Sequence, residues 1–440
     1  MGISGVIGLG IGSVFSLLPG LHVYNIAGLI LLYSLAHPGA IAEQALPGLM
    51  LGMVVGYAFV SNIPSLFLGA PDESAIFVVL PGQKYMMSGR GYEAAMLMGV
   101  GSLLALVALM LATPFLVGVL PDVKTVLRPH MFWILAAVLL FLVMSEWPKG
   151  TDREKTGIGR WLGGWRNVGA GLLTMAVSGF LGIVLMNSAI LPSEAGFQGF
   201  MPVFIGLFAI PMVLTNIISN APVPKQHFST GVDLTWGTML RGAGGGVLGG
   251  LFAATFPVVT GGIGGLLAGH ATAQRDDRSF VVSQGANKLV YYVGAFLLFF
   301  LPGSGLGKGG MASMTSIVYS PKRPEEFYAL MGIAALMGVV AFFFSLFAAR
   351  LTVRILARVD YRRVSLVTLV LALVLVAVPF YSSGVHSLIM AYAVTLVSAG
   401  IGMLPVAFGA RRVNCMAVLL VPLIINMSGL GPPVLRFLGL

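Results

Sequence analysis

The chain has 440 residues, of which only 9% are charged and 57% are hydrophobic, with a formal net charge of +10. Soluble proteins carry about 25% charged residues, so this composition excludes an ordinary soluble globular protein. Continuous apolar runs also exclude a β-barrel, whose strands need alternating segments of about ten residues. The sequence predicts an all-α, multi-pass protein of the cell membrane. Basic residues fall in short loops, and no basic patch is interleaved with aromatics on a polar face, so we expect no nucleic-acid partner.

The chain begins with two apolar segments, 2–18 and 24–36, that a Pro-Gly pair separates. A membrane span needs about 20 residues, so these segments are predicted to be two halves of a broken element. His22 and Asn25 follow the break, where their side chains either bind substrate or cap the second half-helix. Further apolar segments lie near 42–62, 91–118, 129–145, 167–189, 199–220, 236–257, 277–301, 324–350, 364–380, 385–409 and 412–435.

The stretch FLGAPDESAIFVVLPGQKY interrupts this apolar pattern. Pro71 cannot continue an upstream helix but suits the first turn of a new one. Asp72, Glu73 and Ser74 would then lie in that turn, where side-chain oxygens meet free backbone N–H groups. We expect the following apolar run to end at the next Pro-Gly pair. The sequence therefore predicts a re-entrant hairpin over about 63–83, with acidic residues that either cap at the membrane surface or form a site at membrane depth.

The second half of the chain repeats parts of the first. Residues 91–110 resemble 324–343, and residues 16–30 resemble 255–269 with a one-residue gap. We therefore predict two repeats, 1–222 and 236–440. In the second repeat, the stretch LPGSGLGKGGMASMTSIVYSPKRP places Ser304 in a polar, glycine-rich tip before a short apolar run. It predicts a second re-entrant hairpin over about 301–321, and Ser304, like Ser74, either binds an anion or caps the helix.

The charged loops indicate how the repeats are oriented. The loops 148–166 and 350–363 are strongly basic, which predicts that both are cytoplasmic. Under the alignment, however, 350–363 matches the weakly basic loop 119–130, so matching loops would lie on opposite faces. This pattern predicts an inverted-topology repeat, with about 10–12 membrane spans and a broken helix and a hairpin in each half. The broken elements and the hairpin tips are expected to meet near the membrane midplane.

Polar residues also precede the apolar run that ends at Leu301. Gln284 and Asn287 could bind substrate there. Lys288 could be a counter-charge for the substrate, pair with Asp72 or Glu73, or extend to the membrane interface.

Known enzyme signatures are absent from the sequence, which contains no HExxH, Walker A or GxSxG motif. Cys415 is the only cysteine, so no thiolate cluster can bind a metal. The histidines show no metal-ligand spacing. We expect no enzyme activity, no metal and no cofactor.

Four motifs follow one another in a specific order: PGLH (19–22), LGAPDESAIFVVLPGQKYMMS (68–88), GRGYEA (89–94) and AQRDDRSFVVSQGANK (273–288). Over almost the whole chain, this order resembles the large membrane subunit of tripartite tricarboxylate transporters, and more closely the archaeal-type members. The resemblance implies a secondary transporter that takes up carboxylates with an ion gradient. Standard members work with a small membrane subunit and an external binding protein, whereas archaeal-type members look like stand-alone proteins.

The sequence departs from the family pattern at two places. Asp72 and Glu73 stand where the family has small residues, and the segment 283–288 reads SQGANK in place of Pro-Glu-x-Ala-Asn-Asn. Acidic groups in place of small polar ones argue against a tricarboxylate substrate and favour coupling to a proton or a cation.

We therefore predict an ion-coupled secondary transporter of small organic anions that works by alternating access. Asp72 and Glu73 would bind the coupling ion, Na⁺ or H⁺. The substrate would be bound by residues of both halves: His22, Asn25, Pro71, Ser74, Gln284, Asn287, Lys288 and Ser304. Expected partners are the anionic substrate and membrane lipid, with a homodimer, an accessory small membrane subunit and a binding protein left open. The alternatives are a translocase of an anionic polyprenyl-phosphate lipid carrier, and a channel or membrane scaffold.

Overall fold

The computed structural model describes residues 1–18, 21–69, 74, 76–147, 157–192, 199–219, 224–256, 259–272, 274, 276–301, 309–381 and 383–440. All regular structure in these ranges is helical. A helix satisfies its own backbone hydrogen bonds, which the membrane interior cannot do. The predicted all-α class is confirmed. Pro71, Asp72, Glu73 and Ser304 lie outside the described residues.

The chain forms two compact units, and each takes sequence from both predicted halves. Unit 1 comprises Met1–Thr125 and Met212–Ala372, and unit 2 comprises Val126–Pro211 and Leu373–Leu440. The boundary between the units therefore does not follow the predicted repeats 1–222 and 236–440. A pair of interlaced repeats is compatible with this division, and the repeats themselves stay a prediction.

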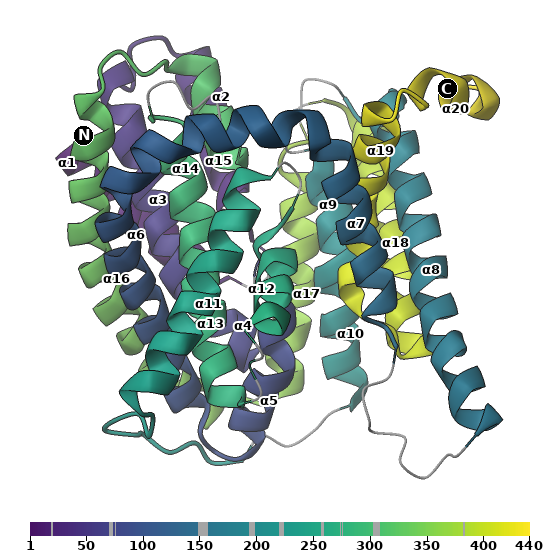
Figure 1. The fold of residues 1–440 in the computed structure, drawn as a ribbon, viewed down its shortest axis with the longest axis horizontal. Helices are drawn as coiled ribbons and strands as arrows, with labels where there is room; N and C mark the ends of the chain where they lie inside the picture. Colours follow the sequence, from purple (N-terminus) through teal and green to yellow (C-terminus); the bar gives the residue numbers. More distant parts are fainter. Residues whose placement is uncertain are drawn as a thin grey trace. The chain divides into compact units, whose positions relative to one another are not determined.

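Unit 1 contains the interrupted helices (Figure 1). Its elements are α1 (Gly2–Phe15), α2 (Val23–Ala36), η1 (Glu43–Ala45), α3 (Leu46–Val60), α4 (Asn62–Phe67), η2 (Ile76–Val78), α5 (Val79–Met87), most of α6 (Gly91–Leu127), most of α10 (Ile210–Ser219), α11 (Trp236–Thr255), α12 (Gly261–Ala271), α13 (Asp277–Leu289), the π-helical turn η6 (Val290–Gly294), α14 (Ala295–Leu298), α15 (Gly310–Val318), α16 (Glu325–Leu356) and most of α17 (Tyr361–Ala377).

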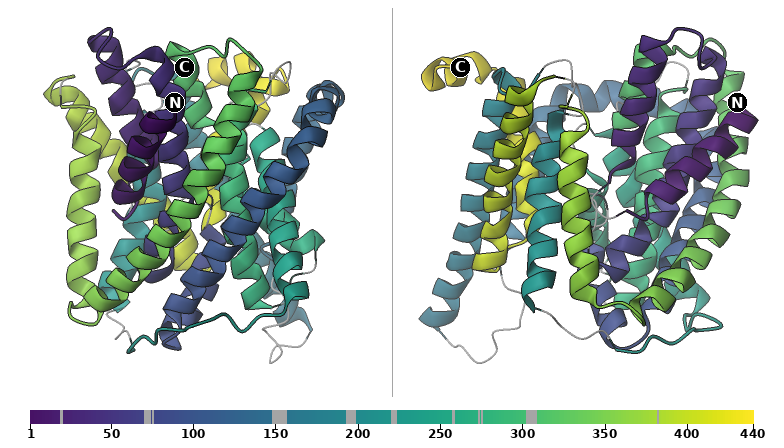
Figure 2. Two further views of the ribbon diagram at one scale, coloured as in Figure 1. Left: turned by 90° about the vertical axis from the view of Figure 1, so that its left-hand side faces the viewer. Right: turned by 180° about the vertical axis from the view of Figure 1, so that it is seen from behind.

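The predicted break after the first helix is confirmed. α1 ends at Phe15 and α2 begins at Val23, and in the right-hand view of Figure 2 α1 runs inward from the N-terminus while α2 returns toward the same edge of unit 1. A second break separates α11 from α12. α12 packs antiparallel along α11, with Gly264 against Gly249. Each half of the chain thus contributes a helix that starts at an interruption.

The expected end of the first hairpin helix at Pro81 and Gly82 is wrong. α5 begins at Val79 and continues through both residues to Met87. Pro81 falls in the first turn of α5, where a missing N–H removes no intrahelical hydrogen bond. The short helix predicted after the second polar tip is confirmed, because α15 covers Gly310–Val318.

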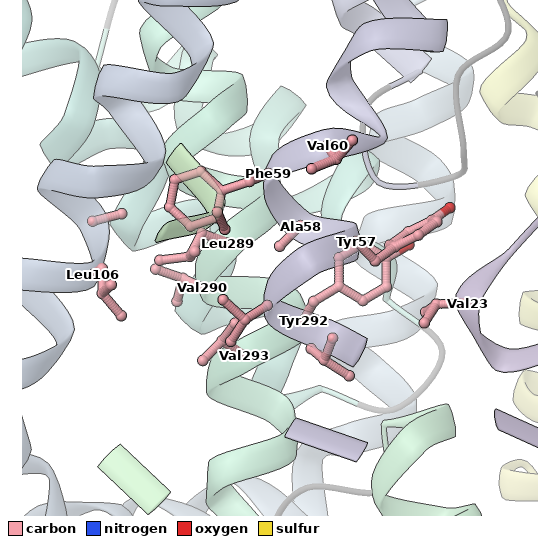
Figure 3. Packing of buried hydrophobic residues seen from close by; sticks show 14 of the residues in the cluster. Val23, Tyr57, Ala58, Phe59, Val60, Leu106, Leu289, Val290, Tyr292 and Val293 are labelled. Atoms are coloured by element: carbon pink, nitrogen blue, oxygen red, sulfur yellow. The ribbon is translucent and has the colours of Figure 1, made fainter. Parts of the chain in front are cut away.

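Glycines bring the backbones of unit 1 into direct contact. A methyl group at Gly8 or Gly12 of α1 would overlap α3 at Leu49 or Met53. Small residues permit this close helix–helix packing in membranes. The neighbouring core is apolar. Figure 3 shows Phe59 directed toward Leu289 on one side of α3, with Tyr57 near Tyr292 on the other.

Unit 2 is a second helical bundle. Its elements are the end of α6, η3 (Arg128–His130), α7 (Met131–Met144), α8 (Ile158–Asn187), α9 (Met201–Phe204), the π-helical turn η5 (Ile205–Ala209), the start of α10, the end of α17, α18 (Val385–Phe408), η7 (Arg412–Met416), α19 (Ala417–Met427) and α20 (Gly431–Leu438). α8 and α18 are the longest helices of this unit. α8 packs on α19, and α18 packs on η5.

Six helical stretches of the described chain are long and apolar enough to cross a membrane, and a pair bent by 117°, Arg412–Met427 with Gly431–Leu438, would make seven. The sequence predicts 10–12 spans. Part of the difference arises because α1, α2 and the 17-residue α17 are each too short to count as a span, and because Gly91–Met144 counts as one stretch. The chain is a multi-pass membrane protein.

Candidate functional site

The candidate site lies in unit 1, where polar residues are buried at the helix interruptions. Ser74, Gln284, Asn287 and Lys288 are 0% exposed, and Asn25 is 6% exposed. Buried polar groups are costly in a membrane protein and mark functional sites by default. The structure therefore brings five of the predicted site residues into the interior of one unit.

Asn287 joins the two halves of the chain at the start of α12. Its Nδ2 donates to the carbonyl oxygen of Gly261 at 2.7 Å, and it lies 3.5 Å from the carbonyl oxygen of Ser74. A methyl group at Gly261 would lie 2.9 Å from the Cβ of Ser74. A side chain at position 261 would therefore collide with Ser74, which lies against the first turn of α12.

His22 caps the start of α2. Its Nδ1 accepts a hydrogen bond from the backbone N–H of Tyr24 at 3.2 Å, and its Nε2 lies 2.9 Å from the hydroxyl of Tyr292. Because Nδ1 is the acceptor, Nε2 carries the proton of the neutral ring and donates to Tyr292. Of the two roles predicted for His22, this geometry favours capping. Asn25 lies one turn further, and its backbone N–H donates to the carbonyl of His22.

Three tyrosines surround His22, and the sequence analysis did not identify them. The ring centroids of Tyr24 and Tyr57 lie 4.2 and 4.9 Å from that of His22, and Tyr57 meets Tyr292 edge-on at 5.3 Å. Tyr292 reaches this group from the π-helical turn η6. Such turns often occur at functional sites but have no clear sequence signature.

Lys288 is directed into this tyrosine cluster. Its Nζ lies 5.3 Å from the centroid of the Tyr57 ring, within the range of a cation–π interaction. The alternative that Lys288 extends to the membrane interface is wrong, because the residue is 0% exposed. A fully buried lysine beside aromatic rings is a candidate counter-charge for an anion.

Gln284 also faces the start of α12, one helical turn before Asn287 and Lys288. A methyl group at Gly265 would lie 3.0 Å from Nε2 of Gln284 and 3.1 Å from Nδ2 of Asn287. Among the residues that the structure describes, neither polar atom of Gln284 has a hydrogen-bond partner. The same holds for Oδ1 of Asn287 and Oγ1 of Thr260.

A family model described as "Tripartite tricarboxylate transporter TctA family" matches residues 3–417. The chain belongs to the TctA family. An uncharacterized protein of Methanocaldococcus jannaschii is 25% identical over 424 residues, which cover 96% of this chain and 97% of that protein. No solved structure matches the chain. The resemblance drawn from the four motifs is confirmed at the level of the family.

This TctA family member also buries a carboxyl group in unit 2, which the sequence analysis did not identify. Oε1 of Glu146 accepts hydrogen bonds from the backbone N–H of Arg411 at 3.0 Å and from Nδ2 of Asn414 at 2.8 Å. Burial raises the pKa of Glu146 above its ordinary value, although these two donors and the charge of Arg411 oppose the rise. A single glutamate after an apolar helix carried no sequence signal for such a cluster.

Metal-ligating side chains do not gather in the described part of this TctA family member, which holds no group of three or more His, Cys, Asp or Glu residues. A narrow pocket lies beside the tyrosine cluster and is lined mainly by α1, α2 and α3, including His22 and Tyr57. The candidate site is thus built from hydrogen-bonding groups, aromatic rings and one lysine.

Proposed function

We propose that the chain is an ion-coupled secondary transporter of small organic anions, carboxylates, that crosses the cell membrane and works by alternating access. Membership of the TctA family makes it a transporter component and implies accessory subunits or a binding protein as partners. The buried polar groups of the site support an anionic substrate, and the two acidic residues before Ser74 support coupling to an ion.

The observation that carries the proposal is the meeting of Ser74, Gly261 and Asn287. Ser74 comes from the first half of the chain, whereas the other two come from the second half, and one amide lies between both carbonyls. α12 begins at this point, and the backbone N–H groups at a helix start attract anions. Lys288, buried on the next position of α13, supplies a full positive charge nearby.

Matched contacts between the halves support an inverted repeat. In unit 2, a methyl at Gly182 of α8 would overlap the carbonyl of Val418, four residues before Pro422. The two halves exchange roles in the second contact: a methyl at Gly402 of α18 would overlap the carbonyl of Leu207, four residues before Pro211. Each glycine also packs on the ring of that proline, Gly182 on Pro422 and Gly402 on Pro211, so the two contacts correspond.

Unit 1 repeats the same relation. Ser74 of the first half lies over the start of α12 in the second half. In return, the start of α15 in the second half lies against α2 in the first, where a methyl at Gly310 would be 2.6 Å from the Tyr24 ring. We propose that these exchanged contacts alternate during transport.

The inverted repeat can be tested by cysteine labelling. Single cysteines introduced at Val126 and Val359, in a Cys415→Ser background, should be labelled from opposite sides of the membrane. If both are labelled from the same side, the repeats are not inverted.

Coupling is assigned to Asp72 and Glu73, which immediately precede Ser74 in the sequence. The test is uptake of labelled carboxylates into proteoliposomes with an imposed Na⁺ or proton gradient. Asp72→Asn with Glu73→Gln should abolish gradient-driven uptake. Neutral amides cannot take up or release a proton, and they bind a cation only weakly. Exchange of substrate at equal concentrations should persist in this variant.

Asp277→Asn serves as the matched control. Asp277 forms an exposed ion pair with Lys84 at 2.9 Å, so its neutralisation should leave uptake unchanged. Gradient-driven uptake that survives in the double variant contradicts the coupling assignment. If folded protein takes up no carboxylate but moves a polyprenyl-phosphate lipid between leaflets, the lipid-carrier alternative replaces the proposal.

A further inference from the structure

The buried amides beside α12 leave specific hydrogen-bonding groups unused. Asn287 commits its Nδ2 to the carbonyl of Gly261, so its remaining group is the acceptor Oδ1. Among the described residues, Gln284 has no partner for its donor or its acceptor, and Thr260 has none for its hydroxyl. All three residues are at most 3% exposed. A buried polar group without a partner is costly, so the arrangement calls for a ligand that supplies both donors and acceptors.

The start of α12 differs from the start of α2, which also follows a break in unit 1. At α2, the side chain of His22 accepts from the Tyr24 N–H. At α12, the N-cap residue Thr260 makes no side-chain cap, although its hydroxyl is buried. α12 has 11 residues, long enough for a helix dipole that favours an anion at this end. The anionic group of a substrate therefore belongs at α12.

A bare carboxylate cannot satisfy this site, because it only accepts hydrogen bonds. Oδ1 of Asn287 and Oε1 of Gln284 also accept and need a donor. A cation would supply attraction to these oxygens, but it would face the positive end of α12 and the nearby charge of Lys288. A hydroxyl group on the carbon next to the carboxylate supplies both kinds of hydrogen bond. It can donate to Oδ1 of Asn287 and accept from Nε2 of Gln284, which leaves only Oε1 of Gln284 to a further donor.

We propose that the site recognises 2-hydroxycarboxylates, with the carboxylate at the first turn of α12 and the hydroxyl between Oδ1 of Asn287 and the amide of Gln284. This inference rests on the proposed function and narrows its substrate class. Lys288 attracts the charge of any carboxylate, whereas the two amides distinguish the hydroxylated acid from its deoxy analogue.

The expected discrimination follows from the cost of leaving these amides unpaired. A deoxy analogue of the same length would cover the two amides without forming hydrogen bonds to them. Its binding should therefore be about tenfold to a hundredfold weaker. Sites built to hydrogen-bond a hydroxyl can reject analogues that lack it by larger factors still.

The experiment is isothermal titration calorimetry on the purified full chain with matched pairs: glycolate and acetate, L-lactate and propionate, L-malate and succinate. In the wild type, the hydroxy acid of at least one pair should bind at least tenfold more tightly than its partner. Gln284→Leu should reduce this ratio to about threefold or less and leave the affinity for the deoxy acid nearly unchanged. Gln44→Leu, at an exposed position in η1, should preserve the ratio.

The outcomes separate this inference from the proposed function. Equal affinities within every pair overturn the inference but leave carboxylate transport standing, and the amides would then hold water. A tenfold ratio that persists in Gln284→Leu overturns the role of Gln284. If no acid binds and none is transported, both proposals fall. If Gln284→Leu does not fold, the wild-type ratios still decide the question.

Discussion

The two units bury polar groups at helix interruptions in different ways. In unit 2, one oxygen of Glu146 receives two hydrogen bonds from within the chain, from Arg411 and Asn414. In unit 1, both polar atoms of Gln284 lack a partner among the described residues. The unit 2 cluster is largely satisfied by its own chain, whereas the unit 1 cluster has unmet requirements that a ligand can fill.

This difference indicates that the polar cluster of unit 2 supports the fold, whereas the polar cluster of unit 1 binds a ligand. A buried carboxylate held by two donors fixes the turn after α7 against η7, which helps to define the packing of unit 2. Unpaired amides beside a lysine and a glycine-rich helix start instead destabilise the empty site, so binding of the right substrate relieves that cost. Substitutions in unit 1 should therefore change ligand affinity most, and substitutions in unit 2 should change stability.

The largest effect is expected at Lys288. Lys288→Met keeps the length and apolar stem of the side chain but removes the buried charge, so carboxylate affinity and uptake should fall about 100-fold. The fold should not weaken, because replacing a buried charge by an apolar group of similar size is often neutral or stabilising. Calorimetry and uptake measure the first effect, and the melting temperature in detergent measures the second.

Lys84→Met is the control for Lys288, because Lys84 is exposed and pairs with Asp277. Carboxylate affinity should be unchanged in this variant. Full affinity in Lys288→Met would show that the helix start alone holds the anion, and a collapse of the melting temperature would instead assign Lys288 a structural role.

A smaller effect is expected at the start of α12. Thr260→Asp places a carboxylate where it can cap the first N–H groups of the helix and repel an anion. Substrate affinity should fall about tenfold, while the free energy of unfolding rises by about 0.5–1 kcal/mol. Thr235→Asp is the matched control, since Thr235 already caps α11 through its side chain. Equal affinity in both variants would contradict an anion site at α12.

Composition and motif order were enough to predict the class, the family, the break between α1 and α2 and the short helix α15. They also singled out Gln284, Asn287 and Lys288 as polar residues before an apolar run, and the structure buries all three. The tyrosines could not be predicted, since Tyr57 lies in an apolar helix and Tyr292 depends on a π-helical turn. The two compact units depend on contacts between distant segments, which the pattern along the chain does not reveal.

The smallest effect is expected at Glu146, and it tests whether unit 2 needs the charge of this carboxyl. Burial raises its pKa in the folded state, so its contribution to stability is fully present below the unfolded pKa and is lost as pH rises through the folded pKa. Glu146→Gln retains an oxygen that can accept from Arg411 and Asn414 but cannot ionise. The melting temperature of this variant at pH 7 should therefore equal or exceed that of the wild type. Any difference between the two melting temperatures should vanish below about pH 4.5. Tryptophan fluorescence follows the unfolding of unit 2, which holds four of the chain's five tryptophans, including Trp147 packed on Trp165 at 5.9 Å. A change of about 1 kcal/mol would move the melting temperature by about 2–4 °C. A variant that melts earlier at pH 7 would mean that the carboxylate charge itself stabilises unit 2, because its hydrogen bonds then outweigh the cost of burial.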